Sequence, residues 1–476
     1  MKRQISWPLR WMLSASAIAV ACASPEPNDV APRGRLGGGG APILPVVASG
    51  IEITPDGFWS EQPWAAEDDW EPAVAVAPDE EGVVHQLTTR YGTSFGTPDP
   101  AVVARRSLDS GWTWQADALL EAAPVTQNDP QVITASGGWV FAAWIEGFEP
   151  GVKVVRSSDS GVTWSAPITI LQAGKPPDFS DKPILVASAD GQRVWVAFNA
   201  SDGWVASSDD FGASFGVPHR TSADGRYWFH NGGAVALDGA VWFTAVDYSQ
   251  DYSGDSNIRL VTSPDGEPPW QTPTLDTSRE LPPCTWDPGC PEGFLGPTSA
   301  VAVDAAGRIV VAYSAARVPN GTLHLYTRRS TDGGATWSPP VEISAGRGHH
   351  TFPALAAGPV PGDFRLAWQD DGAGTGFWNT RLARSTDGGL TWSAPVRLSD
   401  RGDGAPYKDP LGYVFPYGDY LELAVDSAGR EHVIWGEGPG WQGPGNVWWT
   451  RRADALTIFE DGFESGGTGH WSAQDR

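Results

Sequence analysis

Short apolar runs with a period of two recur along the chain, and Gly, Pro, Asp or Asn residues bound each run. In residues 300–313, two runs rich in Val, Ala and Ile flank a tight turn that begins at Asp304. Residues 423–435 repeat this arrangement with Asp426 in the turn. Alternation bounded by turn residues is typical of short antiparallel strands joined by hairpins. The pattern therefore predicts an all-β protein.

A second recurring segment follows many of these strands. Residues 106–114 read Arg-Ser-Leu-Asp-Ser-Gly-Trp-Thr-Trp, and further copies occupy residues 156–164, 207–215, 263–270, 329–337 and 384–392. Asp accepts hydrogen bonds from N–H groups in a tight turn, Gly supplies positive φ, and Trp covers the apolar base of a hairpin. We therefore expect a structural role for the aspartates of the six copies, which are Asp109, Asp159, Asp209, Asp265, Asp332 and Asp387.

The repeats define the architecture. Strand pairs begin near residues 72, 130, 183, 231, 297, 353 and 419, at a mean spacing of about 58 residues. Most pairs are followed by a third strand that leads into an Asp segment and by a fourth strand after it. Seven units of four antiparallel strands are typical of a β-propeller, with six blades as the alternative. We expect residues 51–54 to supply the missing outer strand of the last unit.

Composition limits the partners. The chain has 57 Gly and 41 Pro among 476 residues, which agrees with many turns. Its formal net charge of −25 repels phosphate backbones, so we expect no nucleic-acid partner. We expect a monomer whose partner is an extracellular glycan or a surface protein.

The first residues resemble an export signal. A basic start precedes an apolar stretch too short to span a bilayer, so residues 1–23 are predicted to be a signal peptide. Two interpretations stay open: simple secretion, or a lipobox in which Cys22 becomes a lipid anchor and the only attachment to a membrane. Both interpretations predict a secreted, periplasmic or cell-surface protein. The lipobox interpretation predicts an outer-membrane lipoprotein. An oxidising compartment then favours a disulfide between Cys284 and Cys290.

Domain boundaries follow from the same patterns. Residues 24–49 are rich in Pro and Gly and are predicted to be a disordered linker. Residues 50–456 form the predicted propeller, and residues 457–476 form a C-terminal tail.

The Ser-x-Asp-x-Gly-x-Thr-Trp copies resemble the Asp boxes, or BNR repeats, of the sialidase superfamily, and the resemblance covers about residues 70–452. It implies a sialidase-like propeller in an exported bacterial protein. Catalytic members of this superfamily are six-bladed. They carry an Arg-Ile-Pro segment, three arginines that grip a carboxylate, an Asp acid/base, and a Tyr nucleophile paired with Glu.

This chain departs from that catalytic set. No Arg-Ile-Pro is present, and the corresponding segments read Trp70-Glu71-Pro72-Ala73 and Asp181-Lys182-Pro183-Ile184. The last unit contains Tyr417-Gly418-Asp419-Tyr420-Leu421-Glu422, which is similar to the nucleophile region. The resemblance implies Tyr420 or Tyr417 as the nucleophile, Glu422 beside it, and Asp129, Asp181 or Asp419 as the acid.

Strand order places the candidate site. Turns between strands one and two and between strands three and four share one face, so the Asp boxes are expected at the bottom of the ring. Residues just before each inner strand then crowd the opposite mouth, where convergent polar groups favour a binding site. The expected binding residues there are Lys182, His230, Asn231 and His350, with Arg90, Arg317, Arg347 and Arg401 in or near the top connections.

Metal and cofactor predictions are limited. A loop with three carboxylates, Asp247, Asp251 and Asp255, has the oxygen ligands that calcium prefers. No cofactor is otherwise expected. The predicted function is binding of extracellular glycans or surface proteins by a propeller without a complete sialidase catalytic set. The alternative is an exo-α-sialidase with a Tyr nucleophile and an Asp acid/base, and a surface scaffold is the third hypothesis.

Overall fold

A computed structural model describes residues 51–453, with gaps at 55–56, 64–67, 93–98, 123–124, 148–150, 172–179, 250–252, 281–295, 345, 375, 400–402, 405–420 and 438–445. The predicted signal peptide, linker and tail, all three cysteines, and the pair Tyr417 and Tyr420 lie outside these residues. Export, the lipid anchor and the disulfide therefore stay predictions. Among the described residues, no helix is long and apolar enough to span a membrane.

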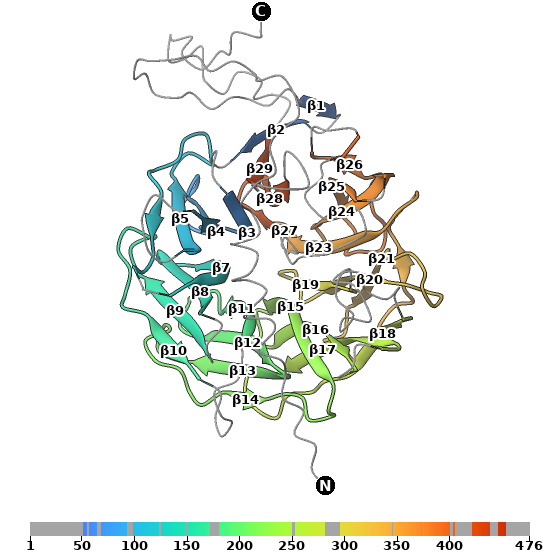
Figure 1. Ribbon diagram of the computed structural model, residues 1–476, viewed down its shortest axis with the longest axis horizontal. Helices are drawn as coiled ribbons and strands as arrows, with labels where there is room; N and C mark the ends of the chain where they lie inside the picture. Colours follow the sequence, from blue (N-terminus) through green and yellow to red (C-terminus); the bar gives the residue numbers. More distant parts are fainter. Residues whose placement is uncertain are drawn as a thin grey trace, which may run out of the picture. The chain divides into compact units, whose positions relative to one another are not determined.

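Seven antiparallel sheets surround a central axis (Figure 1), which confirms the predicted propeller and selects seven blades. The first three blades are β3 (Asp68–Val76), β4 (Val84–Tyr91), β5 (Ala101–Ser107) and β6 (Ala118–Leu119); β7 (Gln127–Ala135), β8 (Trp139–Glu146), β9 (Val152–Ser157) and β10 (Ile168–Ile170); and β11 (Asp181–Ala187), β12 (Val194–Ala200), β13 (Asp202–Ser208) and β14 (His219–Arg220).

Three more blades of four strands follow in chain order. They are β15 (Tyr227–Val235), β16 (Val241–Tyr248), β17 (Ser256–Ser263) and β18 (Thr274–Ser278); β19 (Ser299–Val303), β20 (Ile309–Ala315), β21 (His324–Ser330) and β22 (Val341–Glu342); and β23 (His350–Ala357), β24 (Phe364–Gly374), β25 (Phe377–Ser385) and β26 (Val396–Arg397). The first strand of each blade contacts the first strands of the neighbouring blades, so these strands surround the axis.

The seventh blade closes the ring with strands from both ends of the described chain. β27 (Leu421–Val425), β28 (Glu431–Glu437) and β29 (Asn446–Ala453) are followed outward by β2 (Gly57–Pro63) and β1 (Ile51–Thr54). The expectation that residues 51–54 form the fourth strand is therefore wrong. Residues 57–63 pair with β29, and β1 pairs antiparallel with β2 as a fifth strand, with Thr54 opposite Gly57.

The core lies between the blades. One cluster joins Phe141, Val152 and Val154 of the second blade to Val194 and Phe198 of the third, and all five side chains are buried. Alternate residues of a strand point to opposite faces of its sheet, so each blade presents an apolar face to both neighbours. The rigid ring that results holds the inner strands in place around the channel.

Each complete Asp box is a turn held by one aspartate. In the second blade, Asp159 Oδ1 accepts from Ser157 Oγ at 2.7 Å and from Thr163 N at 2.8 Å, and Oδ2 accepts from Thr163 Oγ1 at 2.6 Å. These bonds, above all that from the Thr163 hydroxyl, lower the pKa of Asp159 to about 2. Equivalent bonds to serine and threonine surround Asp109, Asp332 and Asp387.

Two boxes differ from the prediction. In the third blade, the serines Ser208 and Ser214 donate to Asp210, so Asp210 and not Asp209 is the box aspartate. The Asp-x-Gly-x-Ser spacing selects Asp210, because only Asp210 has a glycine two residues later and a serine four residues later, and Ser214 closes the turn on its carboxylate. In the fourth blade, Asp265 keeps the bond from Ser263 but accepts from Glu267 N in place of a threonine.

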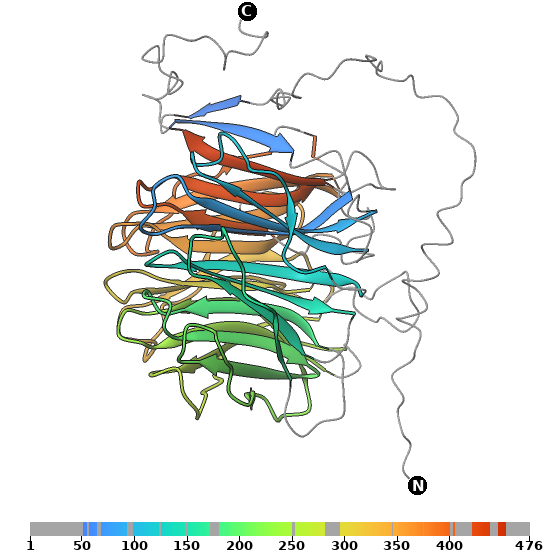
Figure 2. The ribbon, with the colours of Figure 1, turned by 90° about the vertical axis from the view of Figure 1, so that its left-hand side faces the viewer.

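The boxes share one face of the ring with the turns between first and second strands. Ser110 N donates to Gly82 O and Ser160 N donates to Gly138 O, so the two kinds of turn touch within one blade. Figure 2 shows the strands running from this face to the other. The inner strands therefore begin at the face opposite the Asp boxes, as predicted.

Candidate functional site

A bulge interrupts the start of the inner strand in several blades. In four blades the residue before a proline has positive φ: Glu71 at 54°, Asp129 at 56°, Lys182 at 44° and Phe352 at 53°. The strand register shifts at each of these positions. A proline has no N–H for the ladder, and a left-handed residue re-aims its side chain. We call these four positions the bulge residues. Asn231 lies in a fifth register shift, between His230 and Gly232.

Contacts at the bulges link one blade to the next. Glu71 Oε2 accepts from the backbone N–H of Asp129 at 2.9 Å, and Asp129 Oδ2 accepts from the N–H of Lys182 at 3.3 Å. The Lys182 ammonium group in turn lies 5.0 Å from the centre of the Phe229 ring in the fourth blade. The side chains of Glu71, Asp129 and Lys182 thus each hold the backbone of the next blade or pack against its inner strand.

The series continues around the axis. Ser299 Oγ donates to Asn231 Oδ1 at 3.2 Å, and Phe352 N donates to Thr298 Oγ1 at 3.0 Å, which joins the fourth blade to the fifth and the fifth to the sixth. Glu422 of the seventh blade accepts from Val74 N of the first at 3.0 Å. We call these linked side chains the polar ring.

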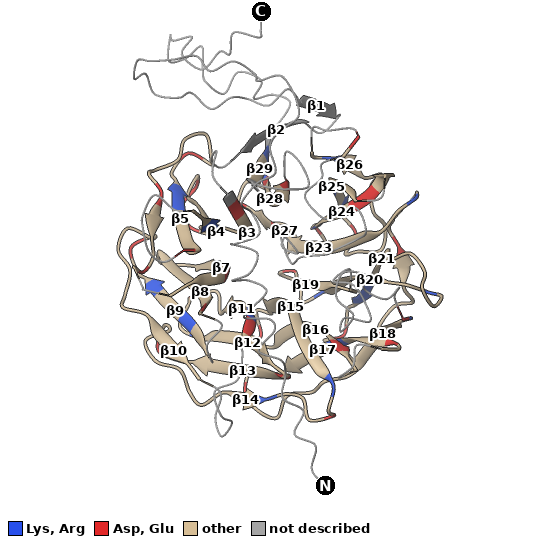
Figure 3. Ribbon diagram, viewed as in Figure 1, with Lys and Arg blue, Asp and Glu red and all other residues tan. Residues whose placement is uncertain are grey.

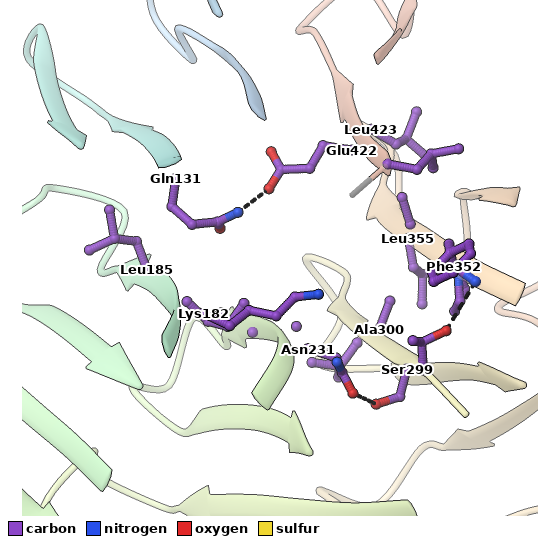
Figure 4. A pocket seen from close by; sticks show the side chains of 18 of the residues that line it. Gln131, Lys182, Leu185, Asn231, Ser299, Ala300, Phe352, Leu355, Glu422 and Leu423 are labelled. Carbon is purple, nitrogen blue, oxygen red and sulfur yellow. Dashed lines mark hydrogen bonds between the residues drawn. The ribbon is translucent and has the colours of Figure 1, made fainter. Parts of the chain in front are cut away.

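The polar ring borders a cavity of about 220 Å³ on the axis, lined by the inner strands of all seven blades. Its lining includes apolar residues of these strands and a smaller polar set. That polar set is Gln131, Lys182, Asn231, Thr298, Ser299 and Glu422 (Figure 4).

Glu422 is the acidic group of this cavity. Its carboxyl accepts from Val74 N and from the side-chain amide of Gln131. Burial raises its pKa to about 7, and these two hydrogen bonds and the charge of Lys182 oppose that shift only in part. Glu422 therefore exchanges a proton in the neutral range, where an ordinary glutamate is ionised.

The arginines expected at the mouth do not converge there. Arg90 is 3% exposed and pairs with Asp69 at 2.7 Å and with Asp117 at 2.9 Å inside the first blade. Arg317 pairs with Asp276 at 2.9 Å, between the fourth and fifth blades. Arg347 is exposed on the connection before β23, and Arg401 lies outside the described residues. No arginine of the described residues lines the cavity.

Two predicted histidines lie within the blades. His230 is fully buried and packs edge-on against Phe243, and burial lowers its pKa to about 3. His350 is also buried, and burial lowers its pKa despite the nearby Asp370. Neither lines the cavity. At His230, strand alternation turns the ring into the sheet packing, while the following residue, Asn231, lines the cavity.

The remaining candidates fall in three places. Asp181 is half-buried at the start of β11, beside Lys182, whereas Asp419 lies outside the described residues, as do the two tyrosines. Asp247 is fully buried and accepts from Arg226 and Arg259, so its carboxylate is neutralised by two guanidinium groups.

Asp255 pairs with Arg279 at 2.9 Å, and Asp251 is not described. Among the residues that the structure describes, no three His, Cys, Asp or Glu side chains are grouped to hold a metal ion. Calcium at this loop stays a prediction that the ion pairs of Asp247 do not favour.

Several residues of the polar ring and of the cavity were not predicted: Glu71, Gln131, Thr298 and Ser299. The available signal was the recurrence of a residue followed by proline at the start of inner strands. That dipeptide indicates a bulge, and the residue before the proline is then the one that is re-aimed. Gln131 and Ser299 carry no such signal, since only their position on the axis distinguishes them from other strand residues.

Comparison with known proteins finds two curated relatives and several solved structures. No protein-family model matches the chain. A xyloglucanase of Hypocrea jecorina is 25% identical over 334 residues, which is 66% of this chain and 38% of that protein. A sialidase of Bacteroides fragilis is 24% identical over 302 residues, which is 55% of this chain and 52% of that protein. The chain thus spans between about two fifths and one half of the length of these curated relatives.

Solved structures with a similar fold include a Hadza microbial sialidase, at 12% identity and a TM-score of 0.45, covering 87% of this chain and 98% of that one. An α-L-arabinanase of Penicillium chrysogenum in complex with arabinobiose has 14% identity and a TM-score of 0.41, and the match covers 64% and 89% of the two chains. The chain is a seven-bladed β-propeller with Asp boxes. Its resemblance to sialidases and related glycosidases, expected from those boxes, is confirmed.

Proposed function

We propose that this protein is an exported propeller that binds a carbohydrate chain at the mouth of its central channel, on the face opposite the Asp boxes. The names of the curated relatives, a xyloglucanase and a sialidase, support a glycan as the ligand. The polar ring supports the location.

The observation that carries the proposal is the row of bulge residues. Glu71, Asp129 and Lys182 come from three neighbouring blades, and each is held by a contact to the next blade. Sugars are recognised by fixed donors and acceptors together with an apolar surface. The ring of Phe229 supplies such a surface beside Lys182.

Binding is favoured over cleavage because the described arginines are engaged elsewhere. A carboxylate-gripping site needs guanidinium groups that converge, whereas Arg90 and Arg317 are paired with aspartates of different blades. The observation that favours the alternative, an exo-α-sialidase, is Glu422. A carboxyl whose pKa is about 7 suits general acid catalysis, and it follows Tyr420 by two residues.

Binding is tested with the full chain on a glycan array, followed by calorimetry with the best ligand. We expect Asp129→Asn to weaken binding by about tenfold or more, since it removes a charge at the mouth and keeps the side-chain shape. The control is Asp238→Asn in an exposed turn of the Asp-box face, which should bind like the parent protein. Equal affinity of both variants and the parent would remove the mouth as the site.

The alternative has its own test. A fluorogenic sialoside is incubated with the parent protein and with Tyr420→Phe. Release of the fluorophore that Tyr420→Phe abolishes would establish cleavage and replace the binding proposal. We expect no release from either protein.

A further inference from the structure

The connection that leads into β23 is bound to the fifth and the sixth blade at once. Residues 346–349, which we call the strap, come directly before this inner strand, on the face of the channel mouth. The side chain of His349 accepts the backbone N–H of Leu323 at its Nδ1 atom, at 3.2 Å. Leu323 is fully buried directly before β21, so this bond ties the strap to the fifth blade.

The backbone of the strap is attached to β24 of the sixth blade. His349 N donates to Asp371 Oδ1 at 2.5 Å, and Asp371 N donates to His349 O at 3.2 Å. The packing is close, since a Cβ at Gly348 would lie 2.4 Å from Asp371 Oδ1. Gly346 and Gly348 both have positive φ, so the strap contains two residues whose backbone can change conformation at little steric cost.

The bond from Leu323 fixes the protonation state of the His349 ring. A ring nitrogen that accepts an N–H carries no proton, so His349 is neutral and has its hydrogen on Nε2. A proton on Nδ1 would place two donors against each other and break the bond. The bond from His350 N to Leu323 O, at 2.9 Å, joins two backbone groups and does not titrate. Of these two bonds to Leu323, only the one at Nδ1 responds to a proton.

We propose that the strap is an acid-sensitive device of the mouth: it is held to the fifth blade while His349 is neutral and is released from Leu323 when the ring takes up a proton. The strap leads into Phe352, one of the bulge residues, so its release changes the mouth at the sixth blade. This inference does not depend on the proposed glycan binding.

The surroundings of the ring set the pH of release. Burial lowers the pKa of His349; the charge of Asp371 on β24 opposes this shift, and that of His324 on β21 adds to it. The strand β23 carries no Lys, Arg, Asp or Glu (Figure 3). The ionisable groups farther out are paired, buried or exposed to solvent: Asp370 with Arg381, Glu342 with His324, the buried His350, and Arg347 of the strap itself.

The sign of the pH dependence follows from the lowered pKa. An unfolded histidine has a pKa of about 6.5, and the folded ring takes up its proton only at lower pH. The attachment to Leu323 is therefore fully present above about pH 6.5, and it is lost as pH falls through the pKa of the folded protein.

Amide hydrogen exchange of the full chain, resolved to single residues and corrected for intrinsic rates, tests the proposal between pH 8 and pH 4.5. We expect the protection of the Leu323 amide to fall about tenfold, with a midpoint below pH 6.5. The amide of Val196, in the core of the third blade, is the internal reference and should keep its protection. Constant protection at Leu323, or a parallel fall at Val196 that indicates global unfolding, would overturn the proposal.

Variants separate the charge of the ring from its shape. His349→Asn keeps an acceptor near the position of Nδ1 but does not titrate, so Leu323 should stay protected at every pH. His349→Phe removes the acceptor, so protection should be low throughout. His219→Asn, at an exposed histidine of β14, is the control and should retain the parent profile. A profile of His349→Asn equal to that of the parent would refute the proposal.

A measurement on the parent protein decides even where a variant does not fold. The ¹⁵N chemical shifts of the two ring nitrogens of His349 report which one carries the hydrogen. We expect the Nε2–H form at pH 8. A hydrogen on Nδ1 at that pH would show that the ring does not accept from Leu323, and the proposal would fail.

Discussion

At the scale of single residues, the structure separates aspartates that look alike in the sequence. Asp209 and Asp210 are adjacent, yet only Asp210 accepts from both Ser208 and Ser214. Asp159 holds the same position in its own box, and its carboxylate accepts three hydrogen bonds, two from side-chain hydroxyls and one from a backbone N–H. The position relative to the following glycine and hydroxyl residue, Gly212 and Ser214 here, decides which carboxylate closes the turn.

We predict that Asp159→Asn lowers the free energy of unfolding by about 0.5–1.5 kcal/mol at neutral pH, because the amide cannot accept both threonine bonds and carries no charge. The pKa of Asp159 is depressed to about 2 from 3.8, so its contribution is complete above about pH 4 and is lost as pH falls toward 2. Urea unfolding at pH 7, 4 and 2 measures this. Asp209→Asn is the matched control and should change little, and an effect of Asp209→Asn as large as that of Asp159→Asn would contradict the assignment.

At the scale of elements, each Asp box both turns the chain and packs closely against the neighbouring blade. Gly334 in the box of the fifth blade has φ of +81°, and a Cβ there would lie 2.2 Å from Cη2 of Trp242 in the fourth blade. Gly266 makes the same kind of approach to Trp195 one blade earlier. Box glycines were predicted to be needed for positive φ alone. The packing adds a second requirement, since there is no room for a side chain.

The neighbouring glycines Gly333 and Gly334 separate these two requirements. Gly333 also has positive φ, of +66°, but a Cβ there would meet nothing within 4 Å. We predict that Gly333→Ala costs about 1 kcal/mol, from backbone strain alone, and that Gly334→Ala costs about 3 kcal/mol or more, because it also displaces Trp242. Chemical denaturation of both variants measures the difference. An equal loss of unfolding free energy in the two variants would show that the close packing of Gly334 against Trp242 does not contribute to stability.

At the scale of the whole molecule, stability depends on how the ring closes. β2 pairs with β29, so Ser60 lies opposite Arg451, nearly four hundred positions later in the chain. Without β2, the backbone groups of β29 would form an open sheet edge, which is prone to pair with other chains. The seventh blade therefore joins the two ends of the described chain and holds the other six blades in register.

We predict that a protein starting at residue 65, which lacks β1 and β2, melts at least ~5 °C below the full chain and associates through the exposed edge. A protein starting at residue 46 retains both strands and is the control. Calorimetry and size-exclusion chromatography make the comparison. A shared melting temperature would mean that ring closure contributes little to stability.

The sequence by itself determined the strands and the repeat, and it favoured seven blades over six. These depend on neighbours along the chain: alternation sets the strands, and the Ser-x-Asp-x-Gly spacing sets the box turns. It also indicated the mouth of the channel, because strand order decides which turns share a face, and Lys182, Asn231 and Glu422 were among the predicted residues.

Only the tertiary structure decided which polar groups meet. Arg90 and His230 looked like mouth residues, yet Arg90 is held by Asp69 and His230 is turned into the blade packing. Gln131 was not predicted, yet it donates to Glu422, almost three hundred positions away. Closure by β2 rather than β1 was decided in the same way. Such contacts form because the ring brings segments together that are far apart in the sequence. The local pattern of residues does not encode which of these segments become neighbours.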